Sequence, residues 1–266
     1  MPCISVDRAN LEYEVTGTGG ETVAFLNGIA MSISHWKPIA GPLSPDYRCL
    51  CHDFRGQLLS SQSPSGHAIH LSDHVEDLQL LLARLGITRV HLVGTSYGAE
   101  VAMMFAAACP TIVSSLCLID GVSELDPLLR ATAEAWKAAA LADPVAFYRT
   151  IVPWNYSSSY IGANAAALAK REVAVAGLPR GYFEDFAALC DAFLEIDLTP
   201  QLARISCPTL VLVGERDILK HAGFARIIAR SIEGARLRVV SGAGHAVVME
   251  QPDTVLTDIR EFLRSV

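Results

Sequence analysis

A serine between two glycines is the first candidate for chemistry. Gly94, Ser96 and Gly98 lie in VHLVGTSYGAEV, which reads as a strand followed directly by a helix. In that context the G-x-S-x-G pattern is typical of a sharp turn whose flanking residues must lack bulk. The turn would place Ser96 at the N-terminus of the helix, where backbone N–H groups can stabilise a developing oxyanion. The alternative is a glycine-rich turn whose serine only caps a helix.

A base is needed to activate Ser96, because a serine hydroxyl is a poor nucleophile until its proton is taken. His245 follows the apolar segment 236–242 and lies in the glycine-rich sequence SGAGH. We expect that loop at the carboxyl edge of a sheet, where ligands bind in open α/β folds. The other seven histidines fit less well, because they belong to a polar loop and helix start (His67, His70 and His74), to the interior of a strand (His91), or to segments without such a loop (His35, His52 and His221). The alternative for His245 is an isolated surface histidine.

An acid is needed to orient the histidine and to stabilise its protonated form. Asp217 comes directly after the apolar run TLVLVG, with room for one helix and one strand before His245. Asp120 ends the run SSLCLI and is the competing acid, since we expect it at the same edge of the sheet. The order Ser96, Asp217, His245 favours Asp217, because it is the chain order expected for a nucleophile on a strand-to-helix turn. The alternative for Asp217 is a turn residue at a strand end.

The elements that must position these residues are indicated by short, almost unbroken apolar runs. Such runs predict strands buried on both faces, as in a parallel sheet, and they occupy residues 23–27, 47–53, 89–94, 114–120, 208–214 and 236–242. Helical patterns lie between several of them, the clearest at 71–86, where Ser72 is the expected N-cap and Gly86 the stop. The segment 11–15 alternates instead, which predicts an antiparallel hairpin strand at the sheet edge. The fold expected is therefore α/β, with helices on both faces of a mostly parallel sheet.

The alternation of strand and helix breaks after Asp120. From 123 to 205 no run typical of a buried strand occurs, and Ala-rich segments with high helix propensity predominate. We predict a helical cap, residues 123–205, inserted after the sixth strand of a core formed by residues 1–122 and 206–266. The aromatic candidates for lining a pocket beneath the cap are Trp36, Trp154 and Tyr156.

Composition and charge exclude several classes of partner. The chain has 266 residues, 51% of them hydrophobic, and a formal net charge of -7. It carries no basic run suited to nucleic acid or to an anionic membrane surface. Its longest apolar stretch, 101–109, is about half of what crosses a bilayer. The N-terminal residues do not have the pattern of a secretory signal, so we expect a cytoplasmic protein without nucleic-acid or membrane partners and leave a homodimer open.

The seven cysteines are scattered, and no two form a CxxC pair that could begin a zinc site. They predict reduced thiols and no metal site, which also fits the cytoplasm.

Together these segments resemble the α/β-hydrolase superfamily. FLNG, DFRG, GTSYG, the helical insert, LVGERD and GAGH occur in the order that the family shows, and the resemblance covers nearly the whole chain. Within the superfamily the chain is similar to small capped hydrolases, which include oxoadipate enol-lactonase-like esterases and cofactor-free haloperoxidases. The resemblance implies that no cofactor is needed, and that the backbone N–H groups of Ile29 and Tyr97 form an oxyanion hole.

Two segments depart from the usual pattern of that family. Asn27 stands where a histidine usually precedes the glycine of the first loop, and the usual DxRGxG reads DFRGQL, with Gln57 and Leu58. Asn27 can still hydrogen-bond and shape the loop, so Ile29 keeps its assignment. Dehalogenases and epoxide hydrolases of this family use an aspartate nucleophile, and the serine at position 96 disfavours both chemistries.

From these residues we expect a serine hydrolase that cleaves a small to medium, largely uncharged carboxylic ester or lactone through an acyl-enzyme intermediate. Ser96 would attack the carbonyl, His245 would transfer the proton, and Asp217 would orient His245. The same residues could instead act on a C–C bond or a thioester, or as a perhydrolase. An alternative from another class is a ligand-binding protein on a hydrolase scaffold.

Overall fold

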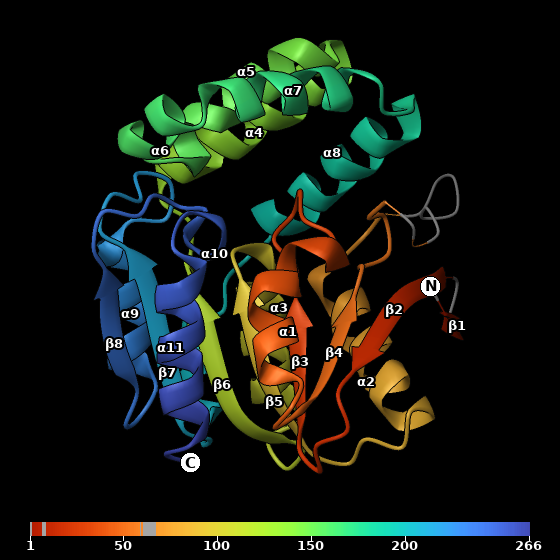
Figure 1. Ribbon diagram of the computed structural model, residues 1–266, viewed down its shortest axis with the longest axis vertical. Helices are drawn as coiled ribbons and strands as arrows, with labels where there is room; N and C mark the ends of the chain where they lie inside the picture. Colours follow the sequence, from red (N-terminus) through yellow and green to blue (C-terminus); the bar gives the residue numbers. More distant parts are fainter. Residues whose placement is uncertain (1, 7–8, 59, 61–67) are drawn as a thin grey trace.

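The protein is built on one mostly parallel sheet. The computed structural model describes residues 2–6, 9–58, 60 and 68–266, and within these ranges eight strands are ordered β1-β2-β4-β3-β5-β6-β7-β8 (Figure 1). β1 and β2 pair antiparallel, as do β2 and β4, whereas every other neighbouring pair is parallel. The strands are β1 (Cys3–Val6), β2 (Ala9–Thr16), β3 (Thr22–Leu26), β4 (Arg48–His52), β5 (Val90–Thr95), β6 (Val113–Ile119), β7 (Thr209–Gly214) and β8 (Arg236–Val240). The sheet confirms the predicted fold class.

Helices cover both faces of this sheet. On one face pack α1 (Lys37–Leu43) and α11 (Pro252–Leu263). On the other face pack α2 (Leu71–Arg84), α3 (Tyr97–Ala108) and α9 (Ala222–Ser231). The shorter elements are the 3-10 turns η1 (Ile33–Trp36) and η2 (Thr199–Arg204) and the helix α10 (Val247–Glu250).

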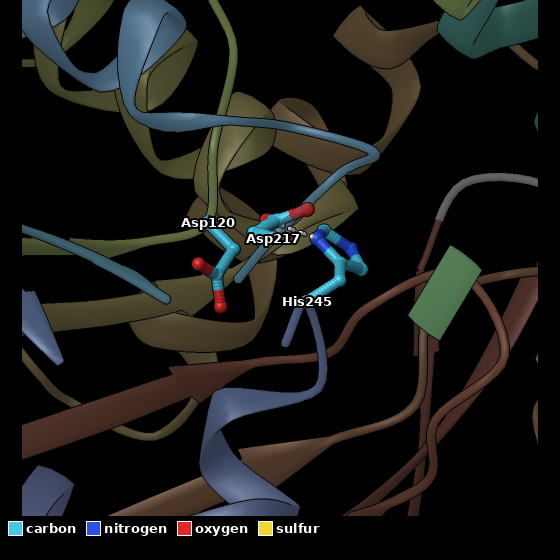
Figure 2. A group of neighbouring side chains, drawn as sticks. All are labelled: Asp120, Asp217 and His245. Carbon is cyan, nitrogen blue, oxygen red and sulfur yellow. Dashed lines mark hydrogen bonds and ion pairs between the residues drawn. The ribbon is translucent and has the colours of Figure 1, made fainter. Parts of the chain in front are cut away.

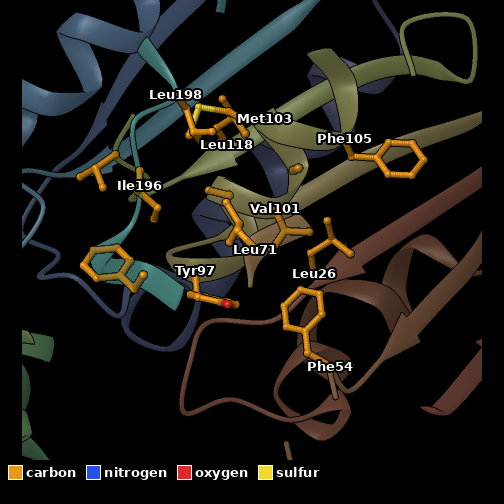
Figure 3. Packing of buried hydrophobic residues seen from close by; sticks show 14 of the residues in the cluster. Leu26, Phe54, Leu71, Tyr97, Val101, Met103, Phe105, Leu118, Ile196 and Leu198 are labelled. Atoms are coloured by element: carbon orange, nitrogen blue, oxygen red, sulfur yellow. The ribbon is translucent and has the colours of Figure 1, made fainter. Parts of the chain in front are cut away.

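The two-residue period of the strands supplies both layers of the core. In β3, Ala24 and Leu26 belong to the layer with α2 and α3, whereas Val23 and Phe25 belong to the layer with α1 and α11. The central helix α3 is apolar on nearly all sides and is correspondingly buried. Figure 3 shows Val101 of α3 among the side chains of neighbouring elements.

Five helices lie between β6 and β7, within the segment predicted as a helical insert. They are α4 (Pro127–Ala142), α5 (Pro144–Asn155), α6 (Ser158–Ala163), α7 (Ala165–Ala176) and α8 (Arg180–Leu194). Figure 1 shows α4 to α7 across one end of the sheet, with α8 descending toward it. An Asp-Pro pair stands at the start of α4 and of α5. The Asp126 and Asp143 carboxylates each accept a backbone N–H of the first helical turn at 2.7 Å, and a proline suits the first helical position. The division into a core of residues 1–122 and 206–266 and a cap of residues 123–205 stays a prediction.

None of the helices in the described ranges has both the length and the apolar character needed to span a membrane.

The strands at the two edges differ from the sequence expectation. The segment 11–15 is antiparallel as predicted, but it belongs to β2, and the short strand β1 pairs along its outer side. At the other end, β8 was expected to be buried on both faces, yet only Val240 is buried. Arg236 and Arg238 alternate along β8 and extend one face into solvent, as an edge strand allows.

The start of α2 also differs from the prediction. The helix begins at Leu71 with His70 as its N-cap, and the Asp73 carboxylate accepts the His70 N–H at 2.9 Å. Ser72 therefore lies inside the first turn and is not the cap. Its end agrees with the sequence, since Gly86 follows the last turn with a φ of 67° that favours glycine.

Two histidines are buried without hydrogen bonds in the same core layer. Among the described residues, neither ring nitrogen of His52 or His74 has a hydrogen-bond partner. The Phe54 ring lies against both, with centroid distances of 5.2 and 4.8 Å. Burial lowers the pKa of His52 to about 4 and the pKa of His74 to about 3. Both side chains are therefore neutral in the folded protein at neutral pH.

These two histidines should make the fold sensitive to acid. Below an ordinary histidine pKa of 6.5 the unfolded chain binds protons that the folded protein does not bind until about pH 4 for His52 and about pH 3 for His74. The free energy of unfolding should therefore fall as the pH is lowered through that window, by up to about 1.4 kcal/mol per pH unit for each histidine. Urea unfolding at several pH values measures the slope.

His74→Leu should make that slope shallower. His70→Ala should not, because the Glu195 carboxylate raises the pKa of this exposed histidine and its pH dependence therefore has the opposite sign. An unchanged slope in His74→Leu would show that the buried histidines are not its source.

Candidate active site

The nucleophile candidate lies on a turn that leaves no room for side chains on either side. Ser96 joins β5 to α3 with a φ of 51° and a ψ of -118°, and its N–H donates to Ile119 O at 2.8 Å. A Cβ atom at Gly94 would lie 2.3 Å from Gly98 O, and one at Gly98 would lie 2.2 Å from Leu26 O. Both glycines are therefore required by the close approach of α3 to the ends of β5 and β3.

The structure brings Ser96, His245 and Asp217 together. His245 Nε2 lies 2.9 Å from Ser96 Oγ, and His245 Nδ1 lies 2.8 Å from Asp217 Oδ2. Figure 2 shows the His245 ring and the Asp217 carboxylate facing each other across this hydrogen bond. Because an ionised carboxylate can only accept, Nδ1 carries the proton, and Nε2 is free to accept from the serine hydroxyl. The arrangement can transfer a proton from Ser96 to His245.

The two acids considered from the sequence have different roles in this arrangement. The other oxygen of Asp217 accepts the N–H groups of Leu219 and Lys220, each at 2.8 Å. Burial raises the pKa of Asp217, but His245 and these N–H groups outweigh burial and hold the pKa of the carboxyl below its ordinary value. Asp120 accepts the Gly214 N–H at 2.9 Å. Burial and then the charge of Asp217 hold the pKa of Asp120 well above its ordinary value, which disfavours the ionised form of Asp120.

Among the described residues, one group of side chains could offer ligands to a metal. It consists of Asp120, Asp217 and His245, and one ligand atom from each lies within 4.8 Å of the others. However, the His245 Nδ1 proton and the Asp217 oxygens are already engaged in hydrogen bonds. The Asp217 carboxylate and the His245 ring bond to each other as a hydrogen-bond acceptor and donor, so these residues do not fit a metal centre.

The loop after β3 is held by Asn27, which departs from the family pattern, and by Gln57. Asn27 Nδ2 donates to Gln57 Oε1 at 3.1 Å. Gln57 Nε2 donates to Gly28 O at 2.9 Å and to Ile29 O at 3.1 Å, while Trp36 Nε1 donates to Asn27 Oδ1 at 2.9 Å. The carbonyl groups of this loop are therefore directed toward the Gln57 amide.

The N–H groups proposed for an oxyanion hole have no partners of their own. Within the described part of the chain, neither the Ile29 N–H nor the Tyr97 N–H makes a hydrogen bond. Tyr97 is the first residue of α3, where N–H groups point out of the helix. Two donors next to Ser96 are thus available to an oxygen atom that develops negative charge.

A buried ion pair lies beside the nucleophile. Lys220 Nζ donates to Glu100 Oε2 at 2.8 Å, and both side chains are at most 3% exposed. The second oxygen of Glu100 accepts the Val122 N–H at 2.8 Å, and the Lys220 ammonium lies 4.5 Å from the centre of the Phe193 ring. Since Lys220 also donates its backbone N–H to Asp217, the pair ties α3 to the loop that carries the acid.

Two cavities meet at Ser96. The smaller, about 30 Å³, has room for one or two water molecules, and the larger, about 260 Å³, lies beneath the inserted helices. Ile29, Ser96 and Trp136 line both cavities. Tyr97 lines only the smaller one, and His245 lines only the larger one. The other residues of the smaller cavity are Leu129, Ala133, Cys190, Phe193, Leu219 and Lys220.

The aromatic residues suggested from the sequence are only partly at these cavities. Tyr156 lines the larger one, but Trp36 is buried beneath the Asn27 loop, and Trp154 lines neither. His35 on η1, considered from the sequence as a histidine that could approach the site, lines the larger cavity. Sequence reasoning missed Arg171 on α7, which lines the same cavity. No local pattern marks Arg171, because the cavity is assembled from segments far apart in the chain. His67 lies outside the described residues.

A family model described as "Alpha/beta hydrolase family" matches residues 23–258. The chain belongs to this family. One relative of this α/β hydrolase is a protein of Azorhizobium caulinodans that is named as a carbamate hydrolase, RutD. The two sequences are 26% identical, and the match covers 95% of this chain and 94% of the RutD chain.

Solved structures of other α/β hydrolases agree with this fold. An α/β hydrolase enzyme from a Medee basin deep-sea metagenome library, MGS-M2, is 26% identical, with a TM-score of 0.94 over 98% of this chain and 97% of its own. The enol-lactonase from Burkholderia xenovorans LB400 is 23% identical, with a TM-score of 0.89 over 99% of this chain and 100% of its own. The likeness to the enol-lactonase is one of fold. The resemblance drawn from the sequence motifs is confirmed.

Breaking the buried ion pair of this α/β hydrolase should destabilise it. Lys220→Met leaves the Glu100 carboxylate buried without its cation, which costs about 3 to 5 kcal/mol. The double variant Glu100→Gln/Lys220→Met removes both charges and keeps an acceptor for the Val122 N–H, so it should recover much of that loss. Urea unfolding of the three proteins measures the difference. A double variant no more stable than Lys220→Met would contradict this account of the pair.

Proposed function

We propose that the protein is a serine hydrolase that cleaves a small to medium carboxylic ester or lactone through an acyl-enzyme intermediate. One observation carries the proposal: an unbroken line of hydrogen bonds joins Ser96, His245 and Asp217, and the serine lies where two cavities meet. A ligand-binding protein on this scaffold would have no use for all three groups in contact.

In the proposed reaction, Ser96 Oγ attacks the substrate carbonyl and its proton passes to His245 Nε2. The resulting imidazolium is stabilised by Asp217, and the oxyanion is stabilised by the N–H groups of Ile29 and Tyr97. His245 then gives the proton to the departing alcohol oxygen, which leaves an acyl group on Ser96. Water attacks this acyl group as His245 takes its proton, and the acid is released with the serine restored.

The cavities suggest where the two parts of the substrate lie. The leaving oxygen must reach His245, and His245 lines only the larger cavity. The acyl group then occupies the smaller cavity, which lies beside Tyr97 and holds little more than a short chain. An acyl part of acetyl size and a longer alcohol part therefore fit the proposed site better than a fatty acyl ester does.

The relatives make a carbamate the first other bond to test. The name of the Azorhizobium relative gives that protein a carbamate as substrate, and attack by Ser96 on a carbamate carbonyl would need the same base and the same oxyanion donors. C–C bond cleavage, thioester hydrolysis and perhydrolysis would use these residues too, but no contact among the described residues favours any of them over an ester.

Turnover should depend on Ser96 and should favour short acyl chains. On a p-nitrophenyl ester series from acetate to decanoate, the wild type should be fastest at the short end. Ser96→Ala should lose about 10³-fold or more in kcat, because it lacks the attacking oxygen. Its melting temperature should barely change, since the Ser96 hydroxyl bonds only to His245 among the described residues.

Ser72→Ala, at an exposed serine of α2, is the matched control and should keep full activity. A fluorophosphonate should label one serine, and Ser96→Ala should not be labelled. Retained turnover in Ser96→Ala would end the proposal. Labelling without turnover of any ester or carbamate would direct the search to another bond, and neither labelling nor turnover would favour the ligand-binding alternative.

The Gln57 amide should position the oxyanion loop. Gln57→Glu keeps the acceptor for Asn27 and Phe54 but loses the donor to Gly28 O and Ile29 O. It should lower kcat by about 10- to 100-fold with little change in KM, because the Ile29 N–H acts mainly in the transition state. Steady-state kinetics on p-nitrophenyl acetate measure kcat and KM separately. A rise in KM at constant kcat would instead give Gln57 a role in the shape of the pocket.

A further inference from the structure

The larger cavity holds a positive charge that no acid neutralises. Arg171 of α7 lines this cavity, and within the described ranges its guanidinium donates to Tyr156 Oη at 2.8 Å but forms no ion pair. The adjacent residue Glu172 is engaged elsewhere, because both of its carboxylate oxygens accept from Arg149 at 2.8 Å. No aspartate or glutamate is among the described residues that line the cavity.

The polar groups around Arg171 can donate but add no negative charge. Tyr148 lines the same cavity and is 5% exposed, yet its hydroxyl has no hydrogen-bond partner among the described residues. Burial and then the charge of Arg171 lower the pKa of His35, so that histidine is neutral and adds no second cation. A guanidinium and an unpartnered buried hydroxyl in the lining of one cavity are a donor set suited to a carboxylate.

We propose that the larger cavity binds a carboxylate on the alcohol part of the substrate, through Arg171 and Tyr148. The proposal rests on the function proposed above, because it places the alcohol part on the side of His245. The proposed substrate class is a short-chain acyl ester of a hydroxy acid. This proposal differs from the sequence expectation of a largely uncharged substrate.

The length of the alcohol part can be found with acetate esters of ω-hydroxy acids. Acetoxyacetate, 3-acetoxypropanoate, 4-acetoxybutanoate and 6-acetoxyhexanoate are each compared with the carboxamide of the same skeleton, which is neutral and of similar size. At the best chain length the wild type should show a KM about tenfold lower for the carboxylate than for the carboxamide, at similar kcat. Added salt should shrink this preference, because Arg171 is exposed.

Arg171→Gln should remove the preference by raising KM for the carboxylate about tenfold, with the carboxamide unchanged. Tyr148→Phe should lose a smaller part of it. Lys170→Gln is the matched control, since this cation lies next to Arg171 on α7, is exposed, and is absent from the cavity. A wild type that prefers the carboxamide at every length would overturn the proposal, as would an Arg171→Gln that affects both substrates alike.

Direct binding separates this proposal from the proposed function. Calorimetry with Ser96→Ala should detect 4-acetoxybutanoate, and Ser96→Ala/Arg171→Gln should bind it about tenfold more weakly. If no ester is turned over but this difference is seen, the anion site stands and the hydrolase function falls. If esters are turned over with no such difference in binding or in KM, the hydrolase stands and the anion site falls.

Discussion

The close approach of α3 to the carboxyl ends of β5 and β3 is the constraint on which the rest of the site depends. Gly98 lies so near Leu26 O that no side chain fits, and Gly94 lies equally near Gly98 O. This contact bends the chain at Ser96 into a left-handed conformation and lifts its hydroxyl away from the sheet. It also sets the first N–H of α3 beside the loop after β3. The nucleophile and both proposed oxyanion donors therefore share one geometric cause.

The loop after β3 shows how a departure from a family pattern can be accommodated by a residue far away in the sequence. Asn27 stands where the family usually has a histidine, and Gln57 lies thirty positions further on. In the structure their amides bond to each other, and Gln57 also takes two loop carbonyl groups. An amide can donate and accept at once, so this pair can fix the loop from both sides. The network thus orders the loop that carries Ile29.

The sequence predicted those parts of the protein that depend on short segments and chain order. Buried strands are recognisable because both faces are apolar, and the order Ser96, Asp217, His245 follows from the topology that brings their loops to one edge. The exposed strand β8 was mistaken for a buried one, because the local pattern does not reveal a missing neighbour on one side. The cavities, with Arg171 and Tyr148, were beyond prediction, since they depend on how the inserted helices sit over the sheet.

The charged groups of the site have different roles according to their distance from Ser96. Next to Ser96, Glu100 is balanced by Lys220, and in the proposed reaction Asp217 balances the imidazolium that forms on His245. An extra fixed charge there would alter the balance of the charges that develop in the transition state. In the proposed complex, Arg171 faces a carboxylate on the alcohol part of the substrate, and the charge of that carboxylate does not change during acyl transfer. Such a contact is equally strong before and during the reaction, so it selects the substrate through KM and leaves the chemical step to the buried groups.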